Sequence, residues 1–81
     1  MSNREKLKAL VMDTFLLDPA EFRFDLMRSE VETWDSLGVV TIAVGVEQVF
    51  GYHFTPEEAT GLKGVADIVA LLTAKGIPFD D

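Results

Sequence analysis

Three helix-start signals divide this chain of 81 residues into helical segments. Ser2 and Thr55 are each followed three residues later by a glutamate, which is the spacing of a helix capping box. Pro56 follows Thr55 at the first helical position, where proline is favoured. Asp35 stands directly before a long apolar segment and is a third N-cap candidate. These signals predict an all-α fold.

Apolar residues recur with the helical period between these signals. We expect helices over about Asn3–Leu16, Ser36–Phe50 and Val65–Lys75, with a short third helix after Thr55. Residues 18–34 form a long connection, and its apolar side chains are expected to pack it across the core. The predicted fold is a small four-helix bundle in one domain, residues 1–81, with a long loop between helices 1 and 2 and a short third helix. Residues 79–81 are expected to fray.

Charge and composition exclude several classes of function. The chain has fourteen acidic and seven basic residues, which gives a net charge of −7. Neither nucleic acid nor an anionic membrane is therefore an expected partner. The absence of cysteine excludes disulfides, thiolate metal sites and cysteine nucleophiles. No apolar stretch approaches the ~20 residues that span a bilayer. The acidic residues are scattered, so no metal site is predicted. We expect a cytoplasmic monomer.

Ser36, at the start of the second predicted helix, is the candidate functional residue. A catalytic serine needs a base and an oxyanion site. The single histidine, His53, lies beyond the end of that helix, and nothing near it in the sequence resembles a catalytic triad. His53 is expected to be a partly buried packing residue. Two interpretations of Ser36 stay open, an ordinary first-turn residue or a covalent attachment point.

The second predicted helix has apolar residues on more than one face. An inward stripe accounts for the core: Val39, Ile42, Ala43, Val46, Val49 and Phe50. A second stripe of Leu37, Val40 and Val44 begins next to Ser36. Either this helix is buried nearly all round, or the second stripe is an exposed docking surface.

The chain resembles the acyl carrier proteins from Leu7 through Leu72. The most specific element is Asp35-Ser36-Leu37, which opens the second helix after a long loop. The end of that helix at Gly51, the short helix that opens at 55–58, and the apolar pattern of 65–72 agree with the family in order and spacing.

This resemblance implies a carrier and not an enzyme. It implies that Ser36 carries 4′-phosphopantetheine, transferred from coenzyme A by a separate phosphopantetheinyl transferase, with Asp35 in a supporting role. The terminal thiol of that arm holds an acyl group as a thioester, and acyl-loading and acyl-transfer enzymes are the further partners. The implied partner contacts are Leu37, Val40, Thr41, Val44 and Glu47. Side chains that would line an inner cleft for the acyl chain are Val46, Phe50, Ile68 and Leu72.

Two features depart from carriers of general fatty acid synthesis, whose second helix is rich in acidic residues. Glu47 is the single charged residue on the corresponding surface here, and Trp34 precedes the motif. The expected role is therefore that of a freestanding carrier in a specialised acyl, polyketide or lipid-modification pathway. Two alternatives stay open, a carrier of aminoacyl groups and a small helical interaction module without a covalent cofactor.

Overall fold

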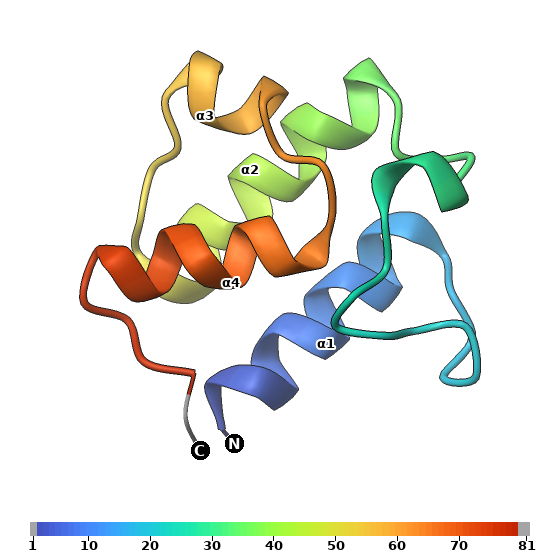
Figure 1. Cartoon of the computed structure of the whole chain (residues 1–81), viewed down its shortest axis with the longest axis horizontal. Helices are drawn as coiled ribbons and strands as arrows, with labels where there is room; N and C mark the ends of the chain where they lie inside the picture. Colours follow the sequence, from blue (N-terminus) through green and yellow to red (C-terminus); the bar gives the residue numbers. More distant parts are fainter. Residues whose placement is uncertain (1, 80–81) are drawn as a thin grey trace.

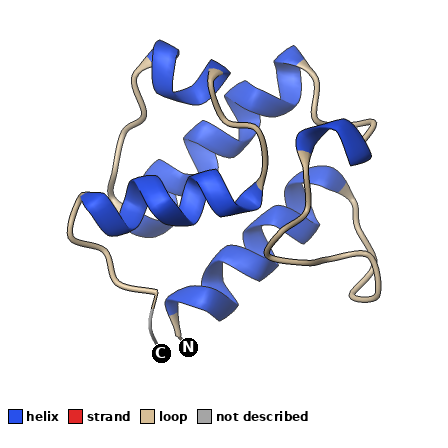
Figure 2. Cartoon of the chain, in the orientation of Figure 1, coloured by secondary structure: helices blue, strands red, loops and turns tan. Residues whose placement is uncertain are grey.

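The structure, a computed structural model, describes residues 2–79 and is built of helices joined by loops (Figures 1 and 2). The elements are α1 (Asn3–Phe15), the 3₁₀ turn η1 (Arg28–Glu30), α2 (Ser36–Phe50), α3 (Pro56–Thr60) and α4 (Val65–Ala74). No strand occurs within residues 2–79, where Met27 and Gly64 form an isolated antiparallel bridge. The predicted all-α fold with a short third helix is confirmed.

The predicted caps form. The Ser2 side chain accepts a hydrogen bond from the Glu5 N–H at 3.1 Å at the start of α1. At the start of α3, Thr55 and Glu58 satisfy each other's backbone N–H groups in a capping box. The chain leaves α1 at Leu16, whose φ of 56° is left-handed, and leaves α2 at Gly51 in the same region.

Buried side chains from all four helices and from the long loop form one core. Its fully enclosed members are Leu7, Val11, Ile42, Val46, Val65, Ile68 and Leu72. The loop between α1 and α2 contributes Leu26, Val31 and Trp34 to this core. Its Phe22 and Phe24 rings lie under Lys8 and Arg4 of α1 at 5.9 and 5.1 Å. The prediction that apolar residues pack this loop is confirmed for these side chains and is wrong for Met27, which is 45% exposed.

The two ends of the described range lie together. The Asn3 amide donates to the Pro78 carbonyl at 2.8 Å, and the Arg4 guanidinium donates to the Phe79 carbonyl at 2.7 Å (Figure 1). Phe79 is buried and its ring lies 5.6 Å from that of Phe50. The prediction that the tail frays is therefore wrong for Phe79, because the aromatic contact anchors it. Asp80 and Asp81 lie outside the described residues.

Two other side chains are more exposed than predicted. Val49 is 42% exposed because it lies about 80° around the axis of α2 from Val39, at the edge of the inward stripe. His53 is exposed rather than packed, and its Nδ1 lies 3.0 Å from a carboxylate oxygen of Glu47.

Candidate functional site

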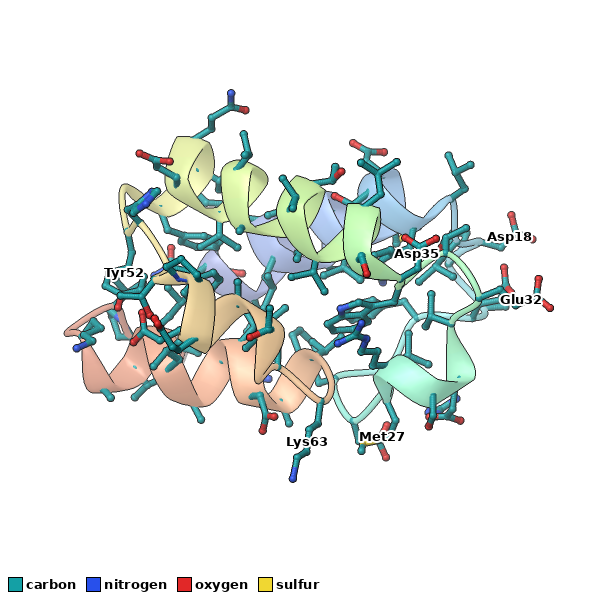
Figure 3. The ribbon with its side chains drawn as sticks, turned by 90° about the horizontal axis from the view of Figure 1, so that it is seen from above. Asp18, Met27, Glu32, Asp35, Tyr52 and Lys63 are labelled. Atoms are coloured by element: carbon teal, nitrogen blue, oxygen red, sulfur yellow. The ribbon has the colours of Figure 1, made fainter. Side chains whose placement is uncertain are left out.

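Ser36 is the first residue of α2 and is exposed. Its hydroxyl makes no hydrogen bond within residues 2–79, so it is accessible to another molecule. Asp35 is the N-cap, and its Oδ1 accepts a hydrogen bond from the Gly38 N–H at 3.0 Å. Figure 3 shows Asp35 at the start of α2. The structure thus presents a carboxylate and a free hydroxyl side by side in the sequence at a helix N-terminus.

Trp34 fixes the position of this helix start. Its indole is 3% exposed and stacks on the Phe15 ring, with centroids 4.8 Å apart. Its backbone carbonyl accepts a hydrogen bond from the Arg28 guanidinium at 3.0 Å. Next to it, the Thr33 hydroxyl donates to the Phe15 carbonyl at 3.1 Å. Asp35 and Ser36 therefore follow a segment that is attached to both α1 and η1.

Sequence reasoning missed Arg28 and Thr33 as positioning residues. Their partners lie six and eighteen residues away along the chain, so no local spacing reveals the contacts. The burial of Trp34 could have been expected from the rarity of exposed tryptophan, but its stacking partner could not.

Gly38 allows α2 to begin this close to the loop. A Cβ atom at Gly38 would collide with the Thr33 carbonyl oxygen and would press on the Phe15 ring. Glycine in a helix interior costs up to ~1 kcal/mol relative to alanine. The close approach explains why this cost is present in the first turn of α2.

The predicted second stripe of α2 is exposed. Leu37, Val40 and Val44 are 74%, 59% and 47% exposed, so the interpretation of a helix buried all round is wrong. Thr41 and Glu47 are also exposed. We call these five residues the α2 strip. It presents three apolar side chains and one acidic side chain to solvent, beginning beside Ser36.

An apolar groove of about 300 Å³ runs between α2 and α3. Its lining residues are Val39, Val40, Ala43, Val44, Glu47, His53, Phe54, Pro56, Ala59 and Thr60. Val40, Val44 and Glu47 belong to both the groove and the α2 strip. By contrast, Val46, Ile68 and Leu72, which were expected to line an inner cleft, have no exposed surface.

Glu58, in the first turn of α3, has a perturbed pKa. Two hydrogen bonds to the Glu58 carboxylate, from the Thr55 N–H and from the Tyr52 hydroxyl, lower the pKa of Glu58. The same contact with Glu58 raises the pKa of Tyr52. Within residues 2–79, no three histidine or acidic side chains gather in a group that could hold a metal ion.

Curated relatives cover most of the chain. It is 32% identical to the acyl carrier protein of Coprothermobacter proteolyticus over 84% of its own length and 83% of the relative's. It is 34% identical to that of Thermosynechococcus vestitus over 88% of both chains. The acyl carrier protein of Helicobacter hepaticus is 32% identical over 91% of this chain and 97% of the relative.

The chain belongs to the acyl carrier protein family.

Members of the acyl carrier protein family are carriers and not enzymes, which confirms the sequence prediction. The general acyl-carrier role is confirmed on the same basis. No family model matches the chain, and no solved structure matches it significantly. Among residues 2–79, none of the helices has both the length and the apolar character needed to cross a membrane.

Proposed function

We propose that Ser36 is the attachment point of 4′-phosphopantetheine and that this chain carries acyl groups as thioesters on the arm. The observation that carries the proposal is the exposed Ser36 hydroxyl, free of hydrogen bonds within residues 2–79, at the start of α2. Ser36 Oγ would attack the pantetheine-side phosphorus of coenzyme A. A new P–O bond forms, the pyrophosphate bond breaks, adenosine 3′,5′-bisphosphate leaves, and a base of the transferase takes the serine proton.

The residues around Ser36 fit such a phosphodiester. The N-terminus of α2 favours a negative group, because its first N–H groups point outward and the helix dipole is positive there. Asp35 accepts the hydrogen bond of the Gly38 N–H, and the Ser36 and Leu37 N–H groups have no capping side chain within residues 2–79. The arm supplies a terminal thiol to a chain that has no cysteine of its own.

The α2 strip is the proposed docking face for the transferase and for acyl-loading and acyl-transfer enzymes. Its exposed apolar side chains favour contacts that exclude water. Glu47 is its single acidic residue, and it is paired with His53 at 3.0 Å. We infer that recognition is less sensitive to salt than in carriers with an acidic second helix, which supports a role in a specialised acyl, polyketide or lipid-modification pathway.

Intact mass tests the attachment. The folded protein is incubated with coenzyme A, Mg²⁺ and a promiscuous phosphopantetheinyl transferase, and we expect one pantetheinyl adduct. Ser36→Ala should abolish the adduct, whereas Ser29→Ala, at another exposed serine, should keep it. An adduct that persists in Ser36→Ala, or folded wild-type protein that takes none, would overturn the proposal.

A further inference from the structure

A wide-open surface cavity of about 600 Å³ lies between η1 and the turn that joins α3 to α4. Two backbone hydrogen bonds fix its walls: the Arg28 N–H donates to the Lys63 carbonyl at 2.7 Å, and the Val65 N–H donates to the Leu26 carbonyl at 3.0 Å. Figure 3 shows Met27 and Lys63 close together where these segments meet. The cavity is thus formed by the fold itself.

The wall of this cavity is rich in hydrogen-bond donors and contains no acidic side chain. It is lined by Met27, Arg28, Ser29, Trp34, Thr60, Gly61, Leu62 and Lys63. Two of these eight residues are cationic, in a chain where acidic residues outnumber basic ones by two to one. Two nearby acids, Glu30 and Asp67, are already engaged: Glu30 binds Arg23 and the Met27 N–H, and Asp67 accepts from the Lys63 N–H.

Trp34 lines this cavity and carries the unexplained polar group, its indole N–H. It is buried and has no acceptor within residues 2–79, and it is the one buried side-chain polar atom there without a partner. A buried donor without an acceptor is unfavourable, and such groups in folded proteins call for a specific explanation. An acceptor supplied by a ligand in the adjoining cavity would provide one once the atoms that cover the N–H move aside.

Arg28 supplies the charge that selects the acceptor. Its Nε donates to the Trp34 carbonyl at 3.0 Å, which orients the guanidinium, and its two terminal nitrogens have no partner within residues 2–79. A guanidinium matches a carboxylate in a paired geometry. Lys63 lies at the rim, and its side chain extends outward in Figure 3.

We propose that this cavity binds the terminal carboxylate of an acyl group carried on the protein's own arm, with Arg28 and the Trp34 N–H as donors. This inference rests on the proposed attachment at Ser36, two residues after Trp34. If so, Arg28 and Trp34 determine specificity: they favour acyl groups that end in a carboxylate over acyl groups of the same shape that end in methyl groups.

The test uses two cargoes of equal shape. The glutaryl group ends in a carboxylate, and the 5-methylhexanoyl group ends in an isopropyl group at the same position. Each is loaded on Ser36 as its acyl-pantetheine, and intact mass verifies the loading before any other measurement. The chain has a single tryptophan, so the ¹⁵N–¹H resonance of its indole reports on Trp34 alone. We expect a downfield shift of the indole proton with glutaryl and little change with 5-methylhexanoyl.

Variants separate binding from a general effect of charge. Arg28→Gln should remove most of the glutaryl-specific shift, whereas Lys6→Gln on α1, which changes net charge equally outside the cavity wall, should keep it. Indole shifts that are the same for both cargoes, or that already appear in full on the unloaded arm, would overturn the carboxylate site. Failure of loading itself would instead count against attachment at Ser36.

Discussion

The Trp34 indole lies stacked on the Phe15 ring, with 4.8 Å between ring centroids and 18° between planes. This contact joins the end of α1 to the residue before Asp35, so the last turn of one helix sets the start of another. The segment that precedes the candidate attachment serine is therefore held in place by this aromatic pair. We expect substitutions in this pair to act on folding before they act on the chemistry at Ser36.

Trp34→Ala should destabilise the protein by about 3–5 kcal/mol, because it removes the stack and leaves a cavity. A domain of this size has about 4–12 kcal/mol in total, so a large share would be lost. Trp34→Phe keeps an aromatic ring and removes the unpartnered N–H, and should cost about 1–2 kcal/mol. Urea unfolding followed by circular dichroism measures both. Leu37→Ala, at an exposed residue, should change the unfolding free energy by no more than about 0.5 kcal/mol. Equal losses at Trp34 and Leu37 would contradict the structural role of the Trp34–Phe15 stack.

Gly38→Ala should destabilise the protein by about 1–2 kcal/mol although alanine is the better helix former. The added methyl meets the fixed Thr33 carbonyl, and this strain exceeds the gain of ~1 kcal/mol in helix propensity. Gly45→Ala is the matched control, since its methyl meets the movable side chain of Leu10. Thermal unfolding should show a larger loss for Gly38→Ala, and the reverse order would refute the backbone contact.

Asp35→Ala should cost about 1 kcal/mol because the Gly38 N–H loses its capping acceptor. Asp35→Asn keeps an acceptor oxygen and should stay close to wild type in stability. If the carboxylate also helps to place the transferase's metal ion, Asp35→Asn should slow modification of Ser36 by about 10-fold. Chemical unfolding and the rate of adduct formation separate the two roles. An unchanged rate for Asp35→Asn would leave capping as the residue's whole contribution.

Val40→Glu should lower kcat/KM of phosphopantetheinylation by about 10-fold, the equivalent of ~1.4 kcal/mol, because it places a charge in the apolar docking face. Stability should change by less than about 0.5 kcal/mol, as Val40 is 59% exposed. Val49→Glu introduces the same charge at an exposed valine of α2 outside the α2 strip and should have little effect. Equal inhibition by both variants would show that net charge, and not the α2 strip, determines docking.

Acid should weaken the fold through Glu58 and Glu30. The pKa of Glu58 is lowered first by the Thr55 N–H, and that of Glu30 first by the Met27 N–H and then by Arg23. A carboxyl whose folded pKa lies below its unfolded value, near 4.5, stabilises the protein above that pH. This contribution is lost as the pH falls from about 4.5 through the folded pKa.

Glu58→Gln and Glu30→Gln should each flatten the fall in unfolding free energy below that pH. The measurement is urea unfolding at a series of pH values. Glu57→Gln, at a carboxylate without a hydrogen bond within residues 2–79, is the control and should keep the wild-type slope. A wild-type slope in Glu58→Gln would mean that its hydrogen bonds do not persist in solution.

The sequence by itself determined the helices and their starts, because capping and apolar periodicity are local. Asp35, Thr55 and Gly51 specify their helix ends through groups within a few residues of each other. The same local logic placed Ser36 at the start of α2. It also gave the apolar stripe of Leu37, Val40 and Val44, whose angular position follows from 3.6 residues per turn.

Tertiary structure alone decided what surrounds that serine. The stack of Trp34 on Phe15, the bond from Arg28 to the Trp34 carbonyl, and the joining of Met27 to Gly64 all link residues that no helical spacing relates. The exposure of the α2 strip was equally undecidable from the sequence, because a second apolar stripe on a helix is either covered by another element or left as a docking surface. The packing of α1 and α3 against α2 leaves those side chains in solvent.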